Sequence, residues 1–376
     1  MMNFMQRTPA FDSGLKSSER PILEVENLYK IFSPDPRASL EMLRRNLSRQ
    51  EIREQGGGVL GLENVSFDVM PGEIFIVMGL SGSGKSTLIR CLNRLVEPSA
   101  GKITLHGEDV TAFDAPRLRE MRRGRMSMVF QSFGLLPHRT VLQNVEMGMA
   151  IRGDDPRMRE AAARDALAKV GLKAWADHYP NTLSGGMRQR VGLARALATN
   201  TDLLLMDEPF SALDPLIRRE LQDELLELQA VLKKTIIFVT HDIQEAVRIG
   251  TRIAIMRDGK TVQIGTPQDL ILNPVNDYVS DFARDLDRGR VLRCCDVMRP
   301  LSLGDDPHSR PRARVQAAAL LADAYRVLSD ADELFVVDSE ETPLGVISSR
   351  DVLGALGAAL PDAGKESARQ EGQYNG

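Results

Sequence analysis

The sequence has few cysteines, few aromatic residues and no long apolar run. Three of its 376 residues are cysteines, and Cys294 and Cys295 are adjacent, which makes a poor disulfide framework and indicates a reducing compartment. No apolar run approaches the ~20 residues that span a bilayer, and residues 1–20 lack the apolar core of a secretory signal. We therefore expect a soluble, cytosolic chain whose membrane role requires a partner.

A strong charge of either sign is also missing. The formal net charge is -4, with 27% charged and 43% hydrophobic residues, which is an ordinary globular balance. This balance gives no reason to expect a nucleic-acid partner, and we expect none. The basic stretch at residues 117–125 would suit nucleic acid or an anionic membrane surface, but a solvated helix face is the preferred interpretation. The length allows two or three domains and at least one large core.

Apolar strands alternate with helical stretches, which predicts a mixed α/β core. Residues 22–32 are predicted to form a strand, and residues 33–58 a helical insert after it. Ser48 and Glu51 form an S-x-x-E capping box, so a second short helix is expected to start inside the insert. The further expected elements are a strand pair around Leu60–Met70, strands Ile74–Met78, Leu203–Asp207 and Ile236–Thr240, and helices Leu88–Leu95, Pro156–Val170 and Pro215–Leu232.

A phosphate-binding pattern, G-x-x-x-x-G-K-[ST], follows the apolar strand 74–78. Its glycines let the backbone turn sharply and aim N–H groups at phosphates, and the following helix start adds partial positive charge. Lys85 is predicted to bridge the β- and γ-phosphates, and Ser86 to give a hydroxyl to Mg²⁺. A chance match is the alternative, but such matches are rare between a buried strand and a helix. The residues expected to bind nucleotide here are Gly79, Ser81, Gly82, Ser83, Gly84, Lys85, Ser86 and Thr87.

Two acids follow a second apolar strand, residues 203–206. Open α/β sheets bind ligands at the carboxyl ends of their strands. Asp207 is predicted to hold Mg²⁺ through its water shell, and Glu208 to polarise the water that attacks the γ-phosphate. Two acids after an apolar run are a weak signal alone, because strands often end in surface acids. Together with the phosphate loop they predict a P-loop nucleoside triphosphatase.

Residues 183–190, LSGGMRQR, lie between the two motifs and start a second glycine-bearing helix. They resemble the LSGGQ signature of the ABC (ATP-binding cassette) ATPases, with Met187 in place of the glutamine. The resemblance implies that Ser184, Gly185 and Gly186 contact phosphates. It also implies a head-to-tail homodimer, in which each ATP lies between the phosphate loop of one subunit and the signature of the other.

The same resemblance assigns further residues in the family's order. Gln131 resembles the Q-loop glutamine, which senses Mg²⁺ and the permease. Asp214, in SALD, resembles the D-loop that crosses the dimer interface, and His241, in FVTHD, the switch histidine that contacts the γ-phosphate. Phe32 best matches the aromatic residue that stacks on adenine, with Tyr29 as second choice. No guanine-specific N-K-x-D motif occurs, so the expected ligands are ATP and Mg²⁺.

Longer phrases, among them SALDPLIRRELQDELLELQ and NPVNDYVSDFAR, resemble one branch of this family. Its subunits energise import of quaternary amines and proline, such as glycine betaine or choline, through a separate integral membrane permease. The resemblance implies an extracytoplasmic substrate-binding protein and a peripheral location at the cytoplasmic face of the bacterial inner membrane. The alternatives are an importer of another small solute (an amino acid or a polyamine) or a soluble ABC ATPase without a transport role.

The fold implied is an ABC cassette, with a RecA-like core, an antiparallel β subdomain and a helical subdomain. It is expected to span residues 21–285, with the Q-loop and helical subdomain at about residues 130–185. Apolar residues after Gln131, namely Phe133, Leu135 and Leu136, would suit a groove for a permease helix or ordinary core packing. The polar ends, residues 1–20 and 362–376, are predicted to be disordered.

Residues 291–358 resemble a single CBS-type module, a small α+β fold that regulates related importers. Ser348 and Asp351 fit the S-x-x-D pattern that contacts a nucleotide ribose in many such modules. Such modules work in pairs, so a second copy would have to come from another subunit. A small packing or dimerisation domain without a ligand is the alternative.

Overall fold

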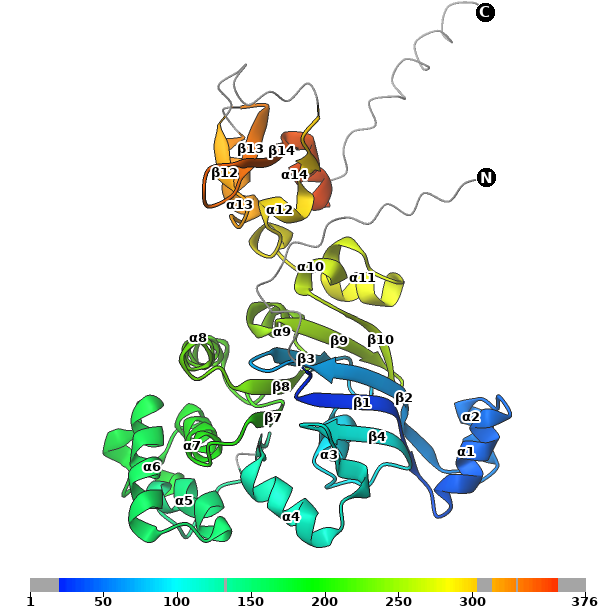
Figure 1. Ribbon diagram of the computed structural model, residues 1–376, viewed down its shortest axis with the longest axis vertical. Coiled ribbons are helices and arrows are strands. Elements are labelled where there is room, and N and C mark those ends of the chain that lie inside the picture. The colour runs from blue at the N-terminus through cyan, green and yellow to red at the C-terminus, as the bar shows by residue number, and fades with distance from the viewer. Residues whose placement is uncertain (1–19, 132–133, 303–312, 329–330, 358–376) are drawn as a thin grey trace, which may run out of the picture. The chain divides into compact units, whose positions relative to one another are not determined.

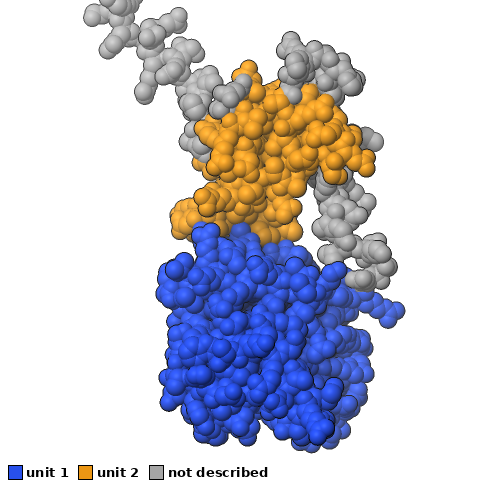
Figure 2. Space-filling model, turned by 90° about the vertical axis from the view of Figure 1, so that its left-hand side faces the viewer, with its two compact units in different colours: residues 1–264 blue, residues 265–376 orange. Residues whose placement is uncertain are grey.

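A computed structural model describes residues 20–131, 134–302, 313–328 and 331–357. Of the ends predicted to be disordered, residues 1–20 and 362–376, all but Arg20 lie outside the described residues. The chain forms two compact units, residues 1–264 and 265–376, which Figure 2 shows in separate colours. The first unit ends before residue 285, where the predicted ATPase domain ends, because helices α10 (Pro267–Leu272) and α11 (Asp277–Ala283) belong to the second. The end of the ATPase domain at residue 285 therefore stays a prediction.

An antiparallel sheet forms one layer of the first unit, in the strand order β2-β1-β4-β5 (Figure 1). Its strands are β1 (Leu23–Phe32), β2 (Val59–Val69), β4 (Ala100–Leu105) and β5 (Glu108–Asp109). The strand pair expected around residues 60–70 is wrong, because β2 runs through it as one strand. Asn64 takes a left-handed φ of 53° at a register shift between β1 and β2, so the strand absorbs an irregularity without turning back.

The second sheet has the order β10-β9-β3-β8-β7-β6. Its strands are β3 (Ile74–Met78), β6 (Met126–Val129), β7 (Leu203–Asp207), β8 (Thr235–Thr240), β9 (Arg252–Arg257) and β10 (Lys260–Gly265). Strands β3, β7 and β8 are buried along their whole length, as apolar strands of parallel sheets usually are. Met78 pairs with Thr240, and Asp207 pairs with Val239. The residues that follow these three strands therefore meet at one edge of the sheet.

Three helices, coloured green in Figure 1, pack against one another as a helical subdomain. They are α5 (Val141–Arg152), α6 (Pro156–Lys169) and α7 (Gly185–Ala198). Apart from the two helices of the insert, the other α-helices described in the first unit are α3 (Lys85–Leu92), α4 (Ala115–Gly124), α8 (Pro215–Leu232) and α9 (Ile243–Ile249). Short 3₁₀ helices occur at Val110–Ala112, Lys173–Trp175, Pro180–Thr182 and, in the second unit, Arg288–Arg290.

The predicted helical insert is present as α1 (Pro36–Arg44) and α2 (Arg49–Glu54). Asp35 caps α1 by accepting hydrogen bonds from two backbone N–H groups. The capping box of Ser48 and Glu51 is confirmed, with both of its reciprocal hydrogen bonds formed. Ile52 is fully buried and fixes α2 against the rest of the unit.

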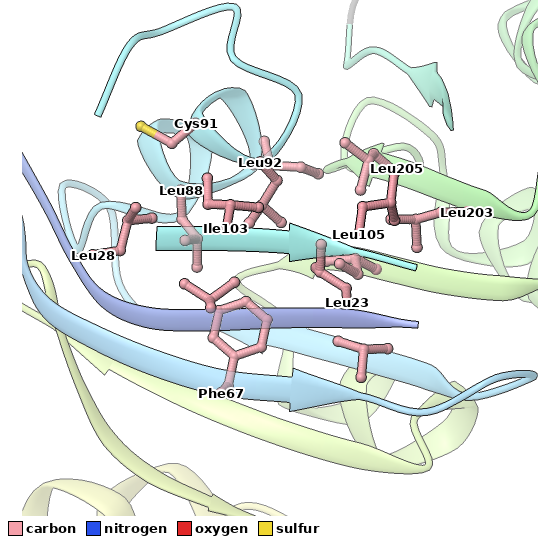
Figure 3. Close-up of a cluster of buried hydrophobic side chains, with 14 of the residues drawn as sticks. Leu23, Leu28, Phe67, Leu88, Cys91, Leu92, Ile103, Leu105, Leu203 and Leu205 are labelled. Carbon is pink, nitrogen blue, oxygen red and sulfur yellow. The ribbon is translucent and has the colours of Figure 1, made fainter. Parts of the chain in front are cut away.

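Buried side chains from β1, β2, β4, α3 and β7 form one hydrophobic cluster, shown in Figure 3. Phe67 of β2 stacks on Phe75 of β3 with ring centroids 4.9 Å apart, so the antiparallel and parallel sheets share this core. Cys91 of α3 lies within the cluster, and burial raises the pKa of its thiol to about 12. The three cysteines are free, as predicted. The cluster holds α3, whose first residue is Lys85, in a fixed place between the sheets.

The second unit contains a four-stranded sheet in the order β11-β14-β13-β12. Its strands are β11 (Arg299–Pro300), β12 (Arg314–Gln316), β13 (Glu333–Val337) and β14 (Pro343–Ser348). Helices α12 (Cys294–Val297), α13 (Leu321–Val327) and α14 (Ser349–Ala355) complete it. Along the chain, α13, β13, β14 and α14 follow one another as helix, strand, strand and helix.

Ser348 and Asp351 form the capping box at the start of α14. The Ser348 hydroxyl donates to Asp351 Oδ2 at 2.6 Å and accepts from the Asp351 backbone N–H at 3.3 Å. Replacing Ser348 with alanine should cost α14 about 1 kcal/mol and raise amide exchange over residues 349–355 roughly fivefold. Hydrogen exchange of the full chain measures this, with Ser349→Ala as the matched control. Unchanged exchange in Ser348→Ala would contradict the capping role.

Candidate nucleotide-binding site

The phosphate loop between β3 and α3 has a backbone that only glycine accommodates at two positions. Gly79 has a φ of 155°, and a Cβ there would lie 2.3 Å from the Met256 carbonyl oxygen. Gly84 has a φ of 102°, and its Cβ would lie 2.7 Å from the Gly61 carbonyl oxygen. Ser83, between them, is 4% exposed, and its Oγ has no hydrogen-bond partner within the described part of the chain. The loop is thus a tight turn in which the buried Ser83 hydroxyl makes no hydrogen bond to the described residues.

Lys85 is the first residue of α3 and is 5% exposed. Its Nζ donates to the carbonyl oxygens of Gly79 at 2.8 Å and Leu80 at 3.1 Å. Burial lowers the pKa of the Lys85 ammonium, and the nearby carboxylates of Glu208 and Asp207 oppose that shift. An ammonium group that is hydrogen-bonded to two carbonyl oxygens of the loop is well placed to bind an anion that enters the loop.

Asp207 is the last residue of β7 and Glu208 follows it, and both carboxylates lie near Lys85. Asp207 is 3% exposed, and its Oδ1 accepts a hydrogen bond from the Ser86 hydroxyl at 3.1 Å. Burial raises the pKa of the Asp207 carboxyl. Glu208 has a left-handed φ of 46°, a strained conformation for a non-glycine residue, and Glu208 Oε1 lies 3.8 Å from Lys85 Nζ.

The Glu208 carboxylate also contacts two further residues that were predicted for the site, His241 and Gln131. His241 Nδ1, after β8, lies 3.2 Å from Glu208 Oε2. Gln131, after β6, donates from Nε2 to the same oxygen at 3.5 Å. The structure therefore gathers six of the predicted site residues at one edge of the sheet: Lys85, Ser86, Gln131, Asp207, Glu208 and His241.

The signature and D-loop residues form a separate cluster. The Ser184 hydroxyl caps α7 by accepting from the Met187 N–H at 3.3 Å, and Asp214 caps α8. A Cβ on Gly186 would lie 2.7 Å from Ile217 Cγ2, so the start of α7 packs closely on the start of α8. Within the described residues, no hydrogen bond or ion pair joins Ser184, Gly185, Gly186 or Asp214 to the phosphate loop.

Phe32 lies beside the far end of the phosphate loop and is 48% exposed. A Cβ on Gly61 would lie 2.8 Å from Phe32 Cε2 and 3.3 Å from Thr87 Cγ2, which brings the ring close to Thr87. Tyr29, the second choice, pairs with Ala100 inside the antiparallel sheet and is half-buried. Phe32 is therefore a half-exposed aromatic ring next to the loop, with Lys30 Nζ over the ring at 4.9 Å from its centroid.

Sequence reasoning missed two side chains that organise the site. Ser211 Oγ donates to the Glu208 carbonyl oxygen at 3.0 Å and lies 3.5 Å from Gln131 Nε2. Arg218 of α8 donates to the Leu213 carbonyl oxygen at 3.3 Å and to Asp242 Oδ2 at 3.0 Å. Arg218 thereby ties the D-loop to the residue after His241. Its spacing of four residues from Asp214 is the only sequence signal, and it does not indicate Asp242.

The residues around Ser86 and Asp207 suit Mg²⁺ as part of a larger ligand set. Carboxylate, hydroxyl, phosphate and water oxygens are the ligands that Mg²⁺ prefers. No group of three or more His, Cys, Asp or Glu side chains in the described ranges could hold a metal by itself. A divalent cation here would therefore need oxygens from a bound nucleotide and from water.

A parallel sheet with a phosphate loop, two acids, a glutamine and a histidine at its carboxyl edge defines a P-loop nucleotide-binding protein. Residues 62–211 match the family model described as ABC transporter. The chain is 48% identical, over 90% of its length and 83% of the relative, to the glycine betaine/proline betaine transport system ATP-binding protein ProV of Salmonella typhimurium. It is 53% identical, over 73% of its length and 70% of the relative, to the glycine betaine/carnitine transport ATP-binding protein GbuA of Listeria monocytogenes. The chain belongs to the ATP-binding proteins of ABC transporters, which are ATPases coupled to transport.

Solved structures of ATP-binding cassettes have a fold similar to that of this chain. A dimeric post-hydrolysis ATP-binding cassette bound to ADP and Pi matches with a TM-score of 0.55 and 30% identity, over 65% of this chain and 98% of that one. The predicted cassette fold is thus confirmed. No helix within the described ranges is both long and apolar enough to cross a membrane.

Proposed function

We propose that this chain hydrolyses ATP to energise import of a quaternary amine or proline-type osmolyte (glycine betaine, choline or proline) through a separate membrane permease. The observation that carries the hydrolytic role is the convergence of Lys85, Gln131 and His241 on the Glu208 carboxylate. The transport names of the relatives, which include a choline transport ATP-binding protein of Bacillus subtilis at 38% identity, support the substrate class.

The reaction is an in-line attack of water on the γ-phosphate of ATP. Glu208 polarises that water, and His241 steadies the Glu208 carboxylate and then the γ-phosphate. Lys85 leaves the loop carbonyls to stabilise the charge on the β- and γ-phosphates. Ser86 and Asp207, with Gln131 nearby, would hold Mg²⁺, which would supply further neutralisation of phosphate charge. Phe32 stacks on the adenine ring.

The complete site requires a homodimer. The start of α7 is a helix terminus of the kind that binds anions, and no hydrogen bond or ion pair among the described residues links it to the phosphate loop of its own subunit. Ser184, Gly185 and Gly186 would therefore close the ATP site of a second copy, with Asp214 at the interface. The dimeric state of related cassettes supports this arrangement.

The permease is proposed to dock beside the Gln131 segment. A mostly apolar cavity of about 490 Å³ lies there, lined by side chains that include Met126, Met128, Phe130 and Ile151. Of the three residues predicted for a groove, Leu135 and Leu136 are half-buried, and Phe133 lies outside the described residues. The chain would thus sit peripherally at the cytoplasmic face of the bacterial inner membrane, in a complex with an extracytoplasmic substrate-binding protein and without nucleic acid.

Residues 291–358 are proposed to be a CBS-like regulatory module. Its sheet and flanking helices support that assignment. Ser348 and Asp351 hydrogen-bond to each other as a helix cap, so a ribose would have to compete with the cap for both side chains.

Uptake by the complete transporter in proteoliposomes tests the substrate class. ATP-dependent uptake is expected for at least one of glycine betaine, choline and proline, and not for a polyamine or an unrelated amino acid. The matched control is the same complex carrying Glu208→Gln, which should take up none of them. Uptake of the polyamine alone would refute the osmolyte assignment, and co-purification with ribosomes in place of membranes would refute transport itself.

A further inference from the structure

The helical insert leaves and rejoins the sheet at the same place, beside the candidate adenine-stacking residue. Phe32, where the insert begins, pairs with Val59, where it ends. A Cβ on Gly58 would lie 2.2 Å from the Phe32 carbonyl oxygen. Ser39 of α1 is fully buried, and its hydroxyl donates to the Gly57 carbonyl oxygen at 2.6 Å. The base of the insert is therefore fixed to the strands, as Figure 1 shows for α1 and α2 beside β1 and β2.

One side chain of the insert reaches back over the sheet. Arg49, the first residue of α2, donates from Nε to Glu63 Oε2 at 3.1 Å. Lys260 Nζ lies 2.8 Å from the other oxygen, Glu63 Oε1. The Glu63 side chain is only 17% exposed, so two cations from different segments clamp one largely buried carboxylate.

Glu63 in turn supports the rear of the phosphate loop. Its backbone N–H donates to the Gly259 carbonyl oxygen at 2.8 Å, and the Gly259 N–H donates to the Ser83 carbonyl oxygen at 2.9 Å. A Cβ on Gly84 would lie 3.3 Å from Gly259 Cα. Gly259 therefore packs against Ser83 and Gly84, and its hydrogen bond from the Glu63 backbone N–H fixes its position.

The Arg49 guanidinium lies against the same glycine. A Cβ on Gly259 would lie 2.7 Å from Arg49 Nη2. That nitrogen is buried and has no hydrogen-bond partner in the described part of the chain. The Arg49 side chain as a whole is 34% exposed and is paired with Glu63 through Nε, so one guanidinium contacts both the Glu63 carboxylate and Gly259. With Lys260 and Glu63 it also leaves one net positive charge behind an anion-binding loop.

We propose that Arg49 is a positioning residue for nucleotide binding. It acts through Glu63 and Gly259 to hold the phosphate loop in its binding conformation. The insert then stabilises the conformation of the phosphate loop, in addition to the contacts made by the sequence motifs of the cassette itself. This inference rests on the proposed binding of ATP by the phosphate loop, and it concerns the affinity for nucleotide and not the chemical step.

Arg49→Met in the full chain tests the proposal. It should weaken MgATP binding about fivefold, the size of a coupling of about 1 kcal/mol within one ion-pair network. The KM for ATP should rise by the same factor, while kcat stays within about twofold, because loop positioning acts on binding and not on the attack of water. Arg53→Met, on the same helix and exposed, is the matched control and should change neither value. Arg49→Lys, which keeps the charge, should restore part of the affinity.

The route through Glu63 is tested by a double-mutant cycle. If Arg49 acts through Glu63, Glu63→Gln should weaken binding alone, and the combined Arg49→Met and Glu63→Gln variant should lose less than the sum. If Arg49→Met does not fold, the MgATP affinity of Glu63→Gln alone tests the proposal, and it should be weaker than that of the wild type. Unchanged affinity in the variants, with a wild-type chain that binds ATP, would overturn this inference alone. A fall in kcat at constant KM would do the same. A wild-type chain that does not bind ATP would overturn the proposed function and this inference together.

Discussion

Glu208→Gln is expected to lower ATP hydrolysis at saturating ATP by at least about a hundredfold, as loss of a general base does. The amide keeps the size of the carboxylate but cannot accept a proton from water. It can still hydrogen-bond with His241 and Gln131, which lie 3.2 and 3.5 Å from Glu208 Oε2. ATP binding should therefore survive, and an ATP-bound dimer should accumulate because its ATP is no longer consumed.

Phosphate release and light scattering in the presence of MgATP measure both effects. Glu227→Gln, an exposed acid on α8, is the matched control and should hydrolyse ATP normally. Near-normal turnover in Glu208→Gln would remove the proposed role of Glu208. Loss of turnover without a stable dimer would contradict the proposed two-subunit ATP site.

Lys85→Ala is expected to weaken MgATP binding roughly tenfold to a hundredfold, the range for losing a hydrogen bond to a charged group. In the structure Lys85 Nζ donates to two loop carbonyl oxygens. These neutral acceptors are weaker partners than phosphate oxygens, so the ammonium can move to the nucleotide. Calorimetric titration with ATP measures the change, with the exposed Lys102→Ala as control. Equal affinity for Lys85→Ala and the wild type would remove Lys85 from the proposed ATP site.

Glu208 was predictable because it follows a fully buried apolar strand, whereas Gln131 follows the partly buried β6 and, like His241, was assigned through the resemblance to the family. The strands β3, β7 and β8 are apolar throughout, so their order in the sheet brings Gly79, Glu208 and His241 to one edge. The phosphate loop was equally predictable, since its glycines are required by contacts such as that between Gly79 and the Met256 carbonyl oxygen.

The supporting side chains were not predictable from one sequence. Arg218 lies on α8 and Asp242 caps α9, and Arg49 and Glu63 join an insert to a strand, so no periodic pattern relates either pair. The single strand β2 was mistaken for two because Asn64 interrupts the alternation of buried residues. The register against β1 shifts at that residue, and the pairing with β1 on both sides of it shows that the chain does not turn back.

The pairing of Phe32 with Val59 has a practical consequence. The two strands already stand in the geometry of a hairpin, and a short turn could connect them in place of residues 33–58 without disturbing their register. Segments that begin and end at one point of a domain tolerate exchange for foreign sequence. This position therefore offers a place to graft an optical reporter beside the adenine end of the ATP site, in a chain that keeps both sheets of the first unit but loses the contact of Arg49 with Glu63.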